Sequence, residues 1–290
     1  MTSYFHFNGA LVPADSVCIP ATDRSYLFGD GLFETILVQN SQPIFLAEHL
    51  TRLQASGTFF DYDLPPNEQL AEDVHAVIAA NAIETGSIRL TVSPQESQGL
   101  LATAQSRLNI LITYRRGSPY TPEQYQSGFH AVIAEVTRRN EHSPLSVHKS
   151  TNYADNILAR QEALDRGADE ALMVNTSGNL TEGTIANLFL VKNQIVFTPP
   201  ITDCVLPGIL RQKVLGLCDT LAIACREETL CPEALQSADE AFLTNSLMGI
   251  MPLATIEGDT FDLSLNSITS RLGIALKDLF RHDIKLSDPR

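Results

Sequence analysis

One short stretch of the chain, residues 115–128, constrains its fold more than any other. It is polar and rich in proline, glycine and serine, and it separates two strongly apolar strand patterns. Stretches of this kind are typical of exposed connections between domains. The sequence therefore predicts a small N-terminal α/β domain over residues 1–118, a linker over 119–128 and a larger C-terminal domain over 129–290.

Strand and helix patterns alternate on both sides of this stretch. LFETILV at residues 32–38 and SIRLTV at 87–92 read as strands, whereas AEHLTRLQASG at 47–57 has leucines at helical spacing. In the second part, FHAVIAEV at 129–136 predicts a strand and residues 153–166 predict a helix. This alternation predicts the α/β fold class.

The charge balance argues against one class of partner. The chain has 20 Lys and Arg residues against 34 Asp and Glu residues, which gives a net charge of −14. Binding to nucleic acid requires a basic surface, so no nucleic-acid partner is expected. An anionic small-molecule substrate would need local positive charge inside its pocket, against the overall field.

The cysteine pattern and the N-terminus indicate a compartment. The chain has five cysteines, and no pair of them has C-x-x-C spacing. This favours reduced thiols over a disulfide framework or a zinc site, so no metal is expected. MTSYFHFNG lacks the basic start and apolar core of a signal peptide, and no apolar run approaches the length of a membrane span. We therefore expect a cytoplasmic protein without a membrane partner.

Two charged residues stand in contexts that suggest chemistry. Lys149 lies in VHKSTNY, just ahead of the predicted helix, and Glu182 lies in LTEGTIANLFLV further along the chain. Most lysines are solvated surface residues and glutamates are common in turns, which are the simpler interpretations. A lysine amine can also form a Schiff base with an aldehyde and move protons, while a carboxylate can keep a pyridine nitrogen protonated. The pair therefore suits a pyridoxal phosphate enzyme.

These strings, in order with FGDGLFET, GADEAL, PGILRQ and NSLMGIMPL, resemble the fold-type IV pyridoxal phosphate enzymes. That group contains D-amino-acid aminotransferases, branched-chain aminotransferases and 4-amino-4-deoxychorismate lyases. The resemblance runs from NGALV near the start to NSLMGIMPL near residue 253. It implies a two-domain fold like that of D-amino-acid aminotransferase, pyridoxal 5'-phosphate as the cofactor, and a homodimer. Lys149 would then be the catalytic residue that carries the cofactor, and Glu182 the partner of the pyridine nitrogen.

The same resemblance implies further contacts to the cofactor. Arg52 in EHLTRLQ resembles the family's phosphate arginine, and its simpler interpretation is an arginine on a helix surface. Tyr153 is placed to reach the ring hydroxyl, although packing in the core is nearly as good an explanation.

Two more segments are expected to hold the phosphate. Ile209 and Leu210 open a helix after Gly208, where free N–H groups and the helix dipole attract an anion; a plain Pro-Gly helix start is the alternative. Asn245 and Ser246 end a predicted strand, where the family adds amide or hydroxyl donors.

The substrate pocket distinguishes the members of this family. D-amino-acid aminotransferases have a tyrosine where this chain has Phe33, and an Arg-x-His where it reads SPQESQGLL. Branched-chain enzymes resemble the chain at Ile88 and Arg89, but their further Arg-Gly after this strand is missing. The lyases share the largest number of sequence motifs with this chain, although they often have Arg-Gly where this chain has Gln98 and Gly99.

The substrate carboxylates therefore need another cation. Arg89 is the first choice, and the others are Arg115, Arg116, Arg138 and Arg139. With Phe33 as an apolar wall and Arg89 as the carboxylate partner, the sequence favours a 4-amino-4-deoxychorismate lyase that forms 4-aminobenzoate and pyruvate in folate biosynthesis. The alternatives are a branched-chain or D-amino-acid aminotransferase and, thirdly, a protein that binds a phosphorylated ligand without chemistry.

Overall fold

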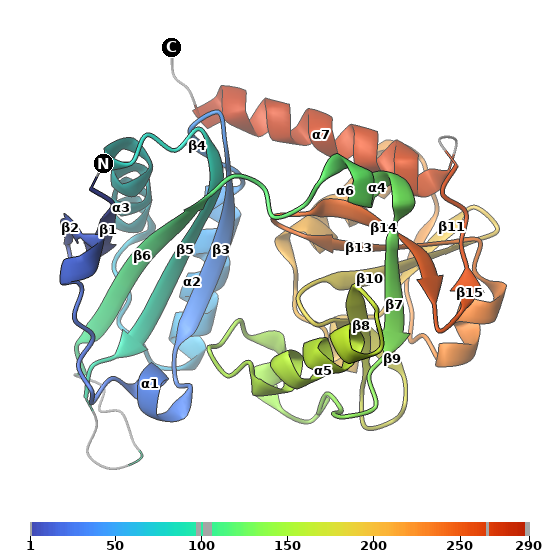
Figure 1. The fold of residues 1–290 in the computed structure, drawn as a ribbon, viewed down its shortest axis with the longest axis horizontal. Coiled ribbons are helices and arrows are strands. Elements are labelled where there is room, and N and C mark those ends of the chain that lie inside the picture. The colour runs from blue at the N-terminus through green and yellow to red at the C-terminus, as the bar shows by residue number, and fades with distance from the viewer. Residues whose placement is uncertain (1, 97–99, 101–105, 265–266, 288–290) are drawn as a thin grey trace. The chain divides into compact units, whose positions relative to one another are not determined.

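A computed structural model covers the chain and describes every residue except 1, 97–99, 101–105, 265–266 and 288–290 (Figure 1). The chain forms two compact units. The first comprises Met1–Ser118, His148–Tyr153 and Phe280–Arg290, and the second comprises Pro119–Val147 and Ala154–Leu279. The units are thus discontinuous in sequence, whereas the sequence predicted one division at residues 119–128. The segment around Lys149 returns to the first unit because its backbone pairs with that unit's sheet.

The first unit contains a six-stranded antiparallel sheet. In spatial order its strands are β2 (Ala10–Pro13), β1 (Tyr4–Phe7), β6 (Leu108–Arg116), β5 (Thr85–Pro94), β3 (Leu32–Gln39) and β4 (Gln42–Pro43). Its helices are α1 (Arg24–Phe28), α2 (Leu46–Phe59) and α3 (Asn67–Ala80). The strand patterns at 32–38 and 87–92 and the helix pattern at 47–57 are therefore confirmed.

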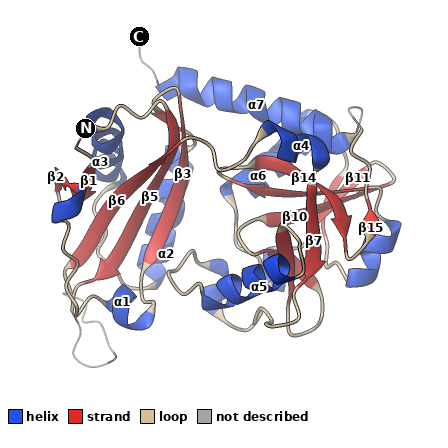
Figure 2. Cartoon of the chain, in the orientation of Figure 1, coloured by secondary structure: helices blue, strands red, loops and turns tan. Residues whose placement is uncertain are grey.

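The apolar face of this sheet packs against α2 and α3, which Figure 2 draws behind the strands. Alternate residues of a strand point to opposite faces, so one face of β3 and β5 supplies the core. That core includes Leu32, Ile36, Val38, Leu50, Leu53, Val74, Val77, Ile88, Leu90 and Val92. Phe33 and Arg89 lie on the opposite face of the same strands, away from these helices.

The second unit contains a strand path that closes on itself. The order is β12 (Cys225–Glu227), β11 (Ile195–Thr198), β10 (Asn187–Lys192), β13 (Glu240–Asn245), β14 (Gly249–Ile256), β7 (Phe129–Ile133), β8 (Glu170–Val174) and β9 (Leu180–Gly183), with β15 (Asp259–Thr260) paired to β14. Because β9 pairs with β10 as well as with β8, the strands from β10 to β9 form a barrel. Glu182, at the end of β9, pairs with Asn187 at this closure.

Helices surround this barrel. They are α4 (Pro122–Ser127), α5 (Ala154–Asp165), α6 (Ile209–Thr220) and α7 (Ile268–Ser287), of which α7 continues into the first unit. Shorter 3-10 turns lie at Ala14–Ser16, Pro144–Val147, Ile201–Asp203 and Pro232–Ser237. The predicted helix at 153–166 is α5, which buries Ala159 and Ala163 against Ala171 and Met173 of β8. The α/β class predicted from the sequence is confirmed. None of the helices in the described part of the chain is long and apolar enough to span a membrane.

Candidate active site

Lys149 is held by backbone pairing at the start of β3. The Phe33 N–H donates to the Lys149 carbonyl at 2.9 Å, and the Thr151 N–H donates to the Gly31 carbonyl at 2.8 Å. The Lys149 Nζ lies 3.4 Å from the Tyr153 hydroxyl oxygen and 4.4 Å from the centre of the Phe33 ring. The amine is partly buried beside two aromatic rings, so Lys149 is not an ordinary solvated lysine.

Tyr153 packs edge-on against Phe33, with the ring centres 5.2 Å apart. It is partly buried, and its hydroxyl is directed at the Lys149 amine. Both earlier interpretations of Tyr153 therefore have support, because the ring packs while the hydroxyl remains available for a polar contact. Its contact with the cofactor stays a prediction.

The Phe33 ring also contacts the side chain of Arg89. The Arg89 guanidinium carbon lies 3.7 Å from the ring centre, which is a cation–π contact. The register of the sheet places Arg89 opposite Thr35, on the same face as Phe33. Although Arg89 is exposed, desolvation of its guanidinium lowers its pKa from the usual value, and the like charge of Arg115 acts in the same direction. An arginine stays charged at neutral pH, so this face presents a partly desolvated cation beside an apolar ring.

Arg52 lies on α2 and faces into the first unit. Its side chain is 12% exposed, so the interpretation as a helix-surface arginine is wrong. The Arg52 guanidinium and the His49 ring both contact the buried carboxylate of Glu34. Burial alone would raise the pKa of Glu34, but the Arg52 charge and the His49 and Arg52 hydrogen bonds outweigh it and hold the pKa at about 2. The sequence analysis did not identify Glu34, although it lies in the quoted FGDGLFET string.

In the second unit, Glu182 is a buried carboxylate, and both of its oxygens have partners. Its Oε1 lies 2.8 Å from Arg139 Nη2, and its Oε2 accepts hydrogen bonds from Asn187 Nδ2 and from the Leu206 N–H, both at 3.1 Å. Glu182 is 5% exposed and ends a strand, so it is not a solvated turn residue. A fixed, buried carboxylate is what a protonated pyridine nitrogen requires as its partner. The sequence analysis also did not identify Asn187, which is the asparagine of the string TIANLFLV.

Helix α6 begins beside Asn187, the residue that donates to Glu182. Gly208 is its N-cap, and Ile209 and Leu210 are its first two residues, both buried. A Cβ added at Gly208 would lie 2.0 Å from Asn187 Oδ1, so only glycine allows the helix start to approach Asn187 this closely. The N–H groups of a first helical turn have no partners within their own helix, which makes this end suited to a phosphate. The residues present thus fit the cofactor at both its ring nitrogen and its phosphate.

Asn245 and Ser246 lie where β13 turns into β14. The Asn245 Oδ1 accepts the N–H groups of Leu247 and Met248, each at 2.9 Å, and its Nδ2 donates to the Ile185 carbonyl at 3.2 Å. The amide of Asn245 is therefore engaged in shaping this turn. Its contact with a phosphate, and that of Ser246, stay predictions.

The structure distinguishes the five arginines that the sequence left open. Arg116 donates to the carbonyls of Asn81 and Ala82, and Arg138 donates to carbonyls of its own segment. Arg139 pairs with Glu182. No carboxylate of the described residues pairs with Arg89 or Arg115. Gln98 and Gly99, which replace the lyases' Arg-Gly, lie outside the described residues.

The described residues contain no group of three or more His, Cys, Asp or Glu side chains that could hold a metal ion. The cysteines are present as free thiols. Each unit thus has residues of the kinds that a pyridoxal phosphate enzyme needs: the first has a lysine beside two aromatic rings, and the second has a buried carboxylate and a glycine-capped helix start.

Comparison with known proteins identifies the family. The family model of amino-transferase class IV matches residues 31–256. D-alanine aminotransferase of Bacillus licheniformis is 30% identical over 260 residues, which is 88% of each chain. The chain belongs to the class IV aminotransferase family, and it is an enzyme that uses pyridoxal 5'-phosphate, as the sequence predicted.

Solved structures of this family have the same fold. Branched-chain aminotransferase of Escherichia coli matches with a TM-score of 0.91 and 27% identity, covering 97% of this chain and 95% of that chain. A putative 4-amino-4-deoxychorismate lyase from Legionella pneumophila matches with a TM-score of 0.83 and 30% identity, covering 92% and 97%. The predicted fold-type IV architecture is confirmed, and the non-enzymatic alternative is excluded.

Proposed function

We propose that the chain is a pyridoxal phosphate-dependent 4-amino-4-deoxychorismate lyase that forms 4-aminobenzoate and pyruvate, and so serves folate biosynthesis. The observation that carries this proposal is the Phe33 ring with the Arg89 guanidinium 3.7 Å from its centre. An apolar ring beside a cation suits a flat cyclohexadiene that bears a carboxylate. Phe33 has no hydroxyl with which to bind the carboxylate of a small amino acid, and leaving such a charge unpaired costs roughly 1–3 kcal/mol or more.

Lys149 and Glu182 have the central roles in this proposal. When bound, the cofactor supplies an aldehyde to which an amine attaches and a ring that withdraws electrons. The Lys149 amine would hold the cofactor and, when free, would take the proton from the substrate carbon that bears the nitrogen. Glu182 would hold the pyridine nitrogen in its protonated form, and the Tyr153 hydroxyl, 3.4 Å from Lys149 Nζ, would orient the amine.

Release of pyruvate leaves an aromatic product. Aromatisation supplies driving force, so the reaction needs no 2-oxo acid to accept an amino group. Arg89 would hold a carboxylate of the ring substrate against the Phe33 face. Arg115, on the neighbouring strand and close enough to lower the pKa of Arg89, adds positive charge there. This supplies the local positive charge that an anionic substrate needs in a chain with a net charge of −14.

Five residues are proposed as phosphate contacts. They are Arg52, Ile209, Leu210, Asn245 and Ser246. Ile209 and Leu210 offer main-chain N–H groups at the start of α6, and the Gly208 N-cap leaves room for a close approach. Arg52 offers a guanidinium whose direction is fixed by Glu34.

A second function is favoured by specific relatives. D-alanine aminotransferase of B. licheniformis and branched-chain aminotransferase of E. coli both resemble this chain over most of its length. An aminotransferase would use the same Lys149 and Glu182 but would require a 2-oxo acid. One preparation should therefore be assayed with aminodeoxychorismate alone, and with D-alanine or L-leucine plus 2-oxoglutarate. Formation of 4-aminobenzoate and pyruvate without a 2-oxo acid would support the lyase. Transamination without any 4-aminobenzoate would show instead that the chain is an aminotransferase.

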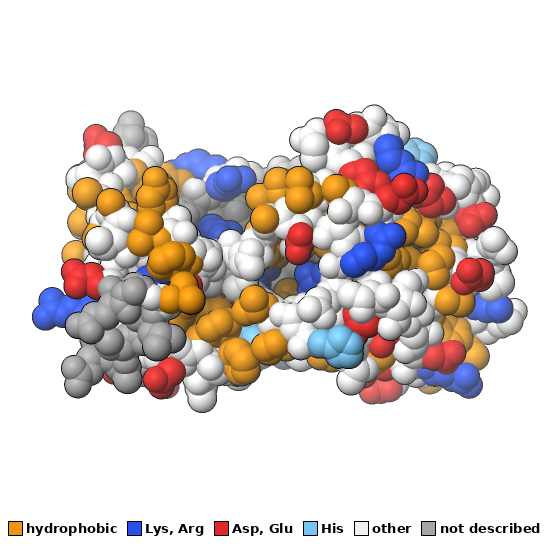
Figure 3. All heavy atoms as spheres, turned by 90° about the horizontal axis from the view of Figure 1, so that it is seen from below, with side chains coloured by type: hydrophobic (Ala, Val, Ile, Leu, Met, Phe, Trp, Pro, Cys, Tyr) orange, Lys and Arg blue, Asp and Glu red, His pale blue; other side chains and the backbone are white. Residues whose placement is uncertain are grey.

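We also propose that the enzyme is a cytoplasmic homodimer. Each unit exposes large apolar side chains: Tyr26, Leu27 and Phe28 on α1, and Ile157, Leu158 and Leu164 on α5. Figure 3 shows exposed hydrophobic side chains among the charged ones on the face it draws. Exposed apolar groups of this size commonly mark surfaces that another protein covers.

A further inference from the structure

Arg139 binds the carboxylate to which the pyridine nitrogen is assigned. Its Nη2 lies 2.8 Å from Glu182 Oε1, and the two side chains are 13% and 7% exposed. We propose that Arg139 is a positioning residue, which holds Glu182 in place and favours its ionised form toward the cofactor. This inference rests on the proposed role of Glu182, and it gives Arg139 a function other than binding the substrate carboxylate.

The Arg139 guanidinium is fixed from several directions. Its Nη2 donates to the Ser146 carbonyl at 2.7 Å, and its Nε donates to the Cys204 carbonyl at 3.2 Å. Leu206, two positions after Cys204, donates its N–H to the other oxygen of Glu182 at 3.1 Å. A planar guanidinium with several occupied donors has little freedom to rotate. Arg139 therefore fixes the position of Glu182 relative to two main-chain segments.

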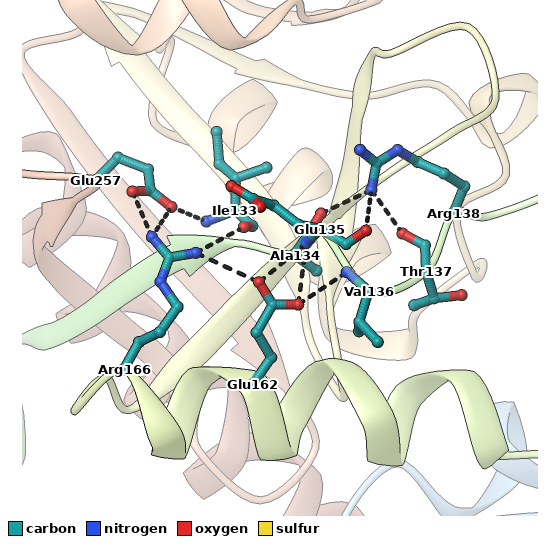
Figure 4. Close-up of polar contacts among 9 residues, drawn as sticks. All are labelled: Ile133, Ala134, Glu135, Val136, Thr137, Arg138, Glu162, Arg166 and Glu257. Atoms are coloured by element: carbon teal, nitrogen blue, oxygen red, sulfur yellow. Dashed lines mark hydrogen bonds and ion pairs between the residues drawn. The ribbon is translucent and has the colours of Figure 1, made fainter.

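The segment just before Arg139, residues 133–138, is held by hydrogen bonds from several side chains, as Figure 4 shows. Glu162 of α5 accepts the N–H groups of Glu135 and Val136 at 2.9–3.1 Å. Arg138 donates to three carbonyls of this segment, at 2.9 Å to Ala134, 3.2 Å to Glu135 and 2.9 Å to Thr137. Arg166, the residue after the end of α5, donates to the Ile133 carbonyl at 3.2 Å and to the carboxylate of Glu257 at 2.7 Å. The backbone just before Arg139 is thus held by Arg138, by Glu162 of α5, and by Arg166 and Glu257, which directly follow α5 and β14.

The charge of Arg139 has a definite effect on a proton shared by Glu182 and a pyridine nitrogen. The pair can exist as carboxylate with pyridinium, or as neutral acid with neutral pyridine. A guanidinium 2.8 Å from a carboxylate oxygen stabilises the ionised form of that carboxylate. Arg139 therefore favours the charged pair, and with it the protonated ring that withdraws electrons. The neutral donors Asn187 and Leu206 orient the carboxylate but contribute no net charge.

The test uses the holoenzyme with nitrogen-15-labelled pyridoxal phosphate, and follows the protonation of the ring nitrogen by NMR. Arg139→Gln should lower the protonated fraction of this nitrogen and reduce turnover by about tenfold or more, since one unit of pKa is tenfold. Arg139→Lys keeps the charge and should restore most of the protonated fraction. Arg160→Gln is the matched control, because it breaks an Arg–Glu contact of 2.8 Å to the buried Glu170 in the same unit. The control should leave the nitrogen signal unchanged.

Glu182→Gln separates this proposal from the proposed function. If Glu182→Gln leaves the nitrogen signal in place, the assignment of Glu182 fails, and the role of Arg139 fails with it. If Glu182→Gln shifts the signal but Arg139→Gln does not, only the role of Arg139 is overturned. The double variant Glu182→Gln/Arg139→Gln removes both charges and avoids an unpaired buried carboxylate if Arg139→Gln alone does not fold. The double variant should give the signal of Glu182→Gln alone, and a further shift would show that Arg139 acts elsewhere.

Discussion

Arg52 and Glu34 form a two-point ion pair inside the first unit, with Nε to Oε1 at 2.8 Å and Nη2 to Oε2 at 2.6 Å. His49 Nδ1 contacts the same carboxylate at 2.7 Å, so both oxygens of Glu34 are occupied. The pair links a strand of the sheet to α2 and fixes one edge of the guanidinium. The pair therefore holds the Arg52 side chain in one orientation.

This pair predicts a specific loss of stability in acid. The pKa of Glu34 is about 2, well below the ordinary value of 4.5 for a glutamate. A depressed carboxyl pKa contributes stability above the unfolded-state value, and this stability is lost as pH falls from about 4.5 through about 2. The full contribution is on the order of 3 kcal/mol. Glu34→Gln should therefore unfold at lower urea concentration at pH 7, with a flatter stability curve in the acid range.

The matched control for Glu34 is Glu72→Gln, an exposed carboxyl on α3. Urea titrations at several pH values should show little change for Glu72→Gln at pH 7. Equal effects of the two substitutions would contradict the special role of the Glu34 pair.

Lys149→Ala should abolish both turnover and the visible absorbance that arises when the amine carries the cofactor. The fold should remain, because Lys149 is held through its main-chain carbonyl, which alanine retains. The measurements are an absorption spectrum, borohydride reduction and circular dichroism. Lys277→Ala, at an exposed position on α7, serves as the control. A Lys149→Ala enzyme that kept its visible band and its activity would refute the assignment.

Glu182→Gln should keep pyridoxal phosphate bound but slow proton abstraction. Glutamine retains acceptor and donor groups, but it lacks the charge that keeps the ring nitrogen protonated. The expected decrease in kcat is about a hundredfold, within the usual range for general acid–base steps. Single-turnover kinetics with aminodeoxychorismate would measure it. An unchanged rate would mean that the pyridine partner lies elsewhere.

Gly208→Ala should weaken binding of the cofactor, because the new Cβ would lie 2.0 Å from Asn187 Oδ1 and displace either α6 or Asn187. Gly216→Ala in the same helix meets nothing within 4 Å and should instead stabilise the protein by roughly 0.5–1 kcal/mol. Titration of the apoenzyme with pyridoxal phosphate and thermal unfolding would compare the two variants. Equal cofactor affinity in both would argue against α6 as the phosphate site.

Arg89→Gln should raise KM for aminodeoxychorismate, since the partner of a substrate carboxylate is lost. Hydrogen bonds to charged groups contribute about 1.5–3 kcal/mol, so kcat/KM should fall by roughly ten- to 150-fold. Arg116→Gln, whose guanidinium binds main-chain carbonyls instead, is the comparison. If Arg116→Gln raises KM as much as Arg89→Gln does, Arg89 is not the specific carboxylate partner.

The proposed homodimer should bury an interface on the order of 2,000 Å² or more, as interfaces that complete a site do. Leu27→Asp on α1 and Ile157→Asp on α5 replace exposed apolar residues by charges and should favour the monomer. Sedimentation velocity at micromolar concentration, combined with an activity assay, would test this. A fully active monomeric wild type would refute the proposal.

Local patterns in the sequence determined much of the fold. The strands around Phe33 and Arg89 and the helices that carry Arg52 and follow Lys149 all appear where periodicity predicted them. Periodicity succeeds here because burial of one face is a property of neighbouring residues in a single element. The ordered motifs also identified the family, the cofactor and the class of enzyme.

The tertiary structure decided the partners of the charged residues. The sequence left Arg139 among several arginines for a substrate carboxylate, and the fold pairs it with Glu182. It likewise gave no sign that Glu34 would fix Arg52, or that the segment of Lys149 would rejoin the first unit by pairing with Leu32 and Phe33. These pairings join residues far apart in sequence. A buried charge must find its counter-charge or hydrogen-bond partners wherever the packed chain brings them, and no local pattern records that position.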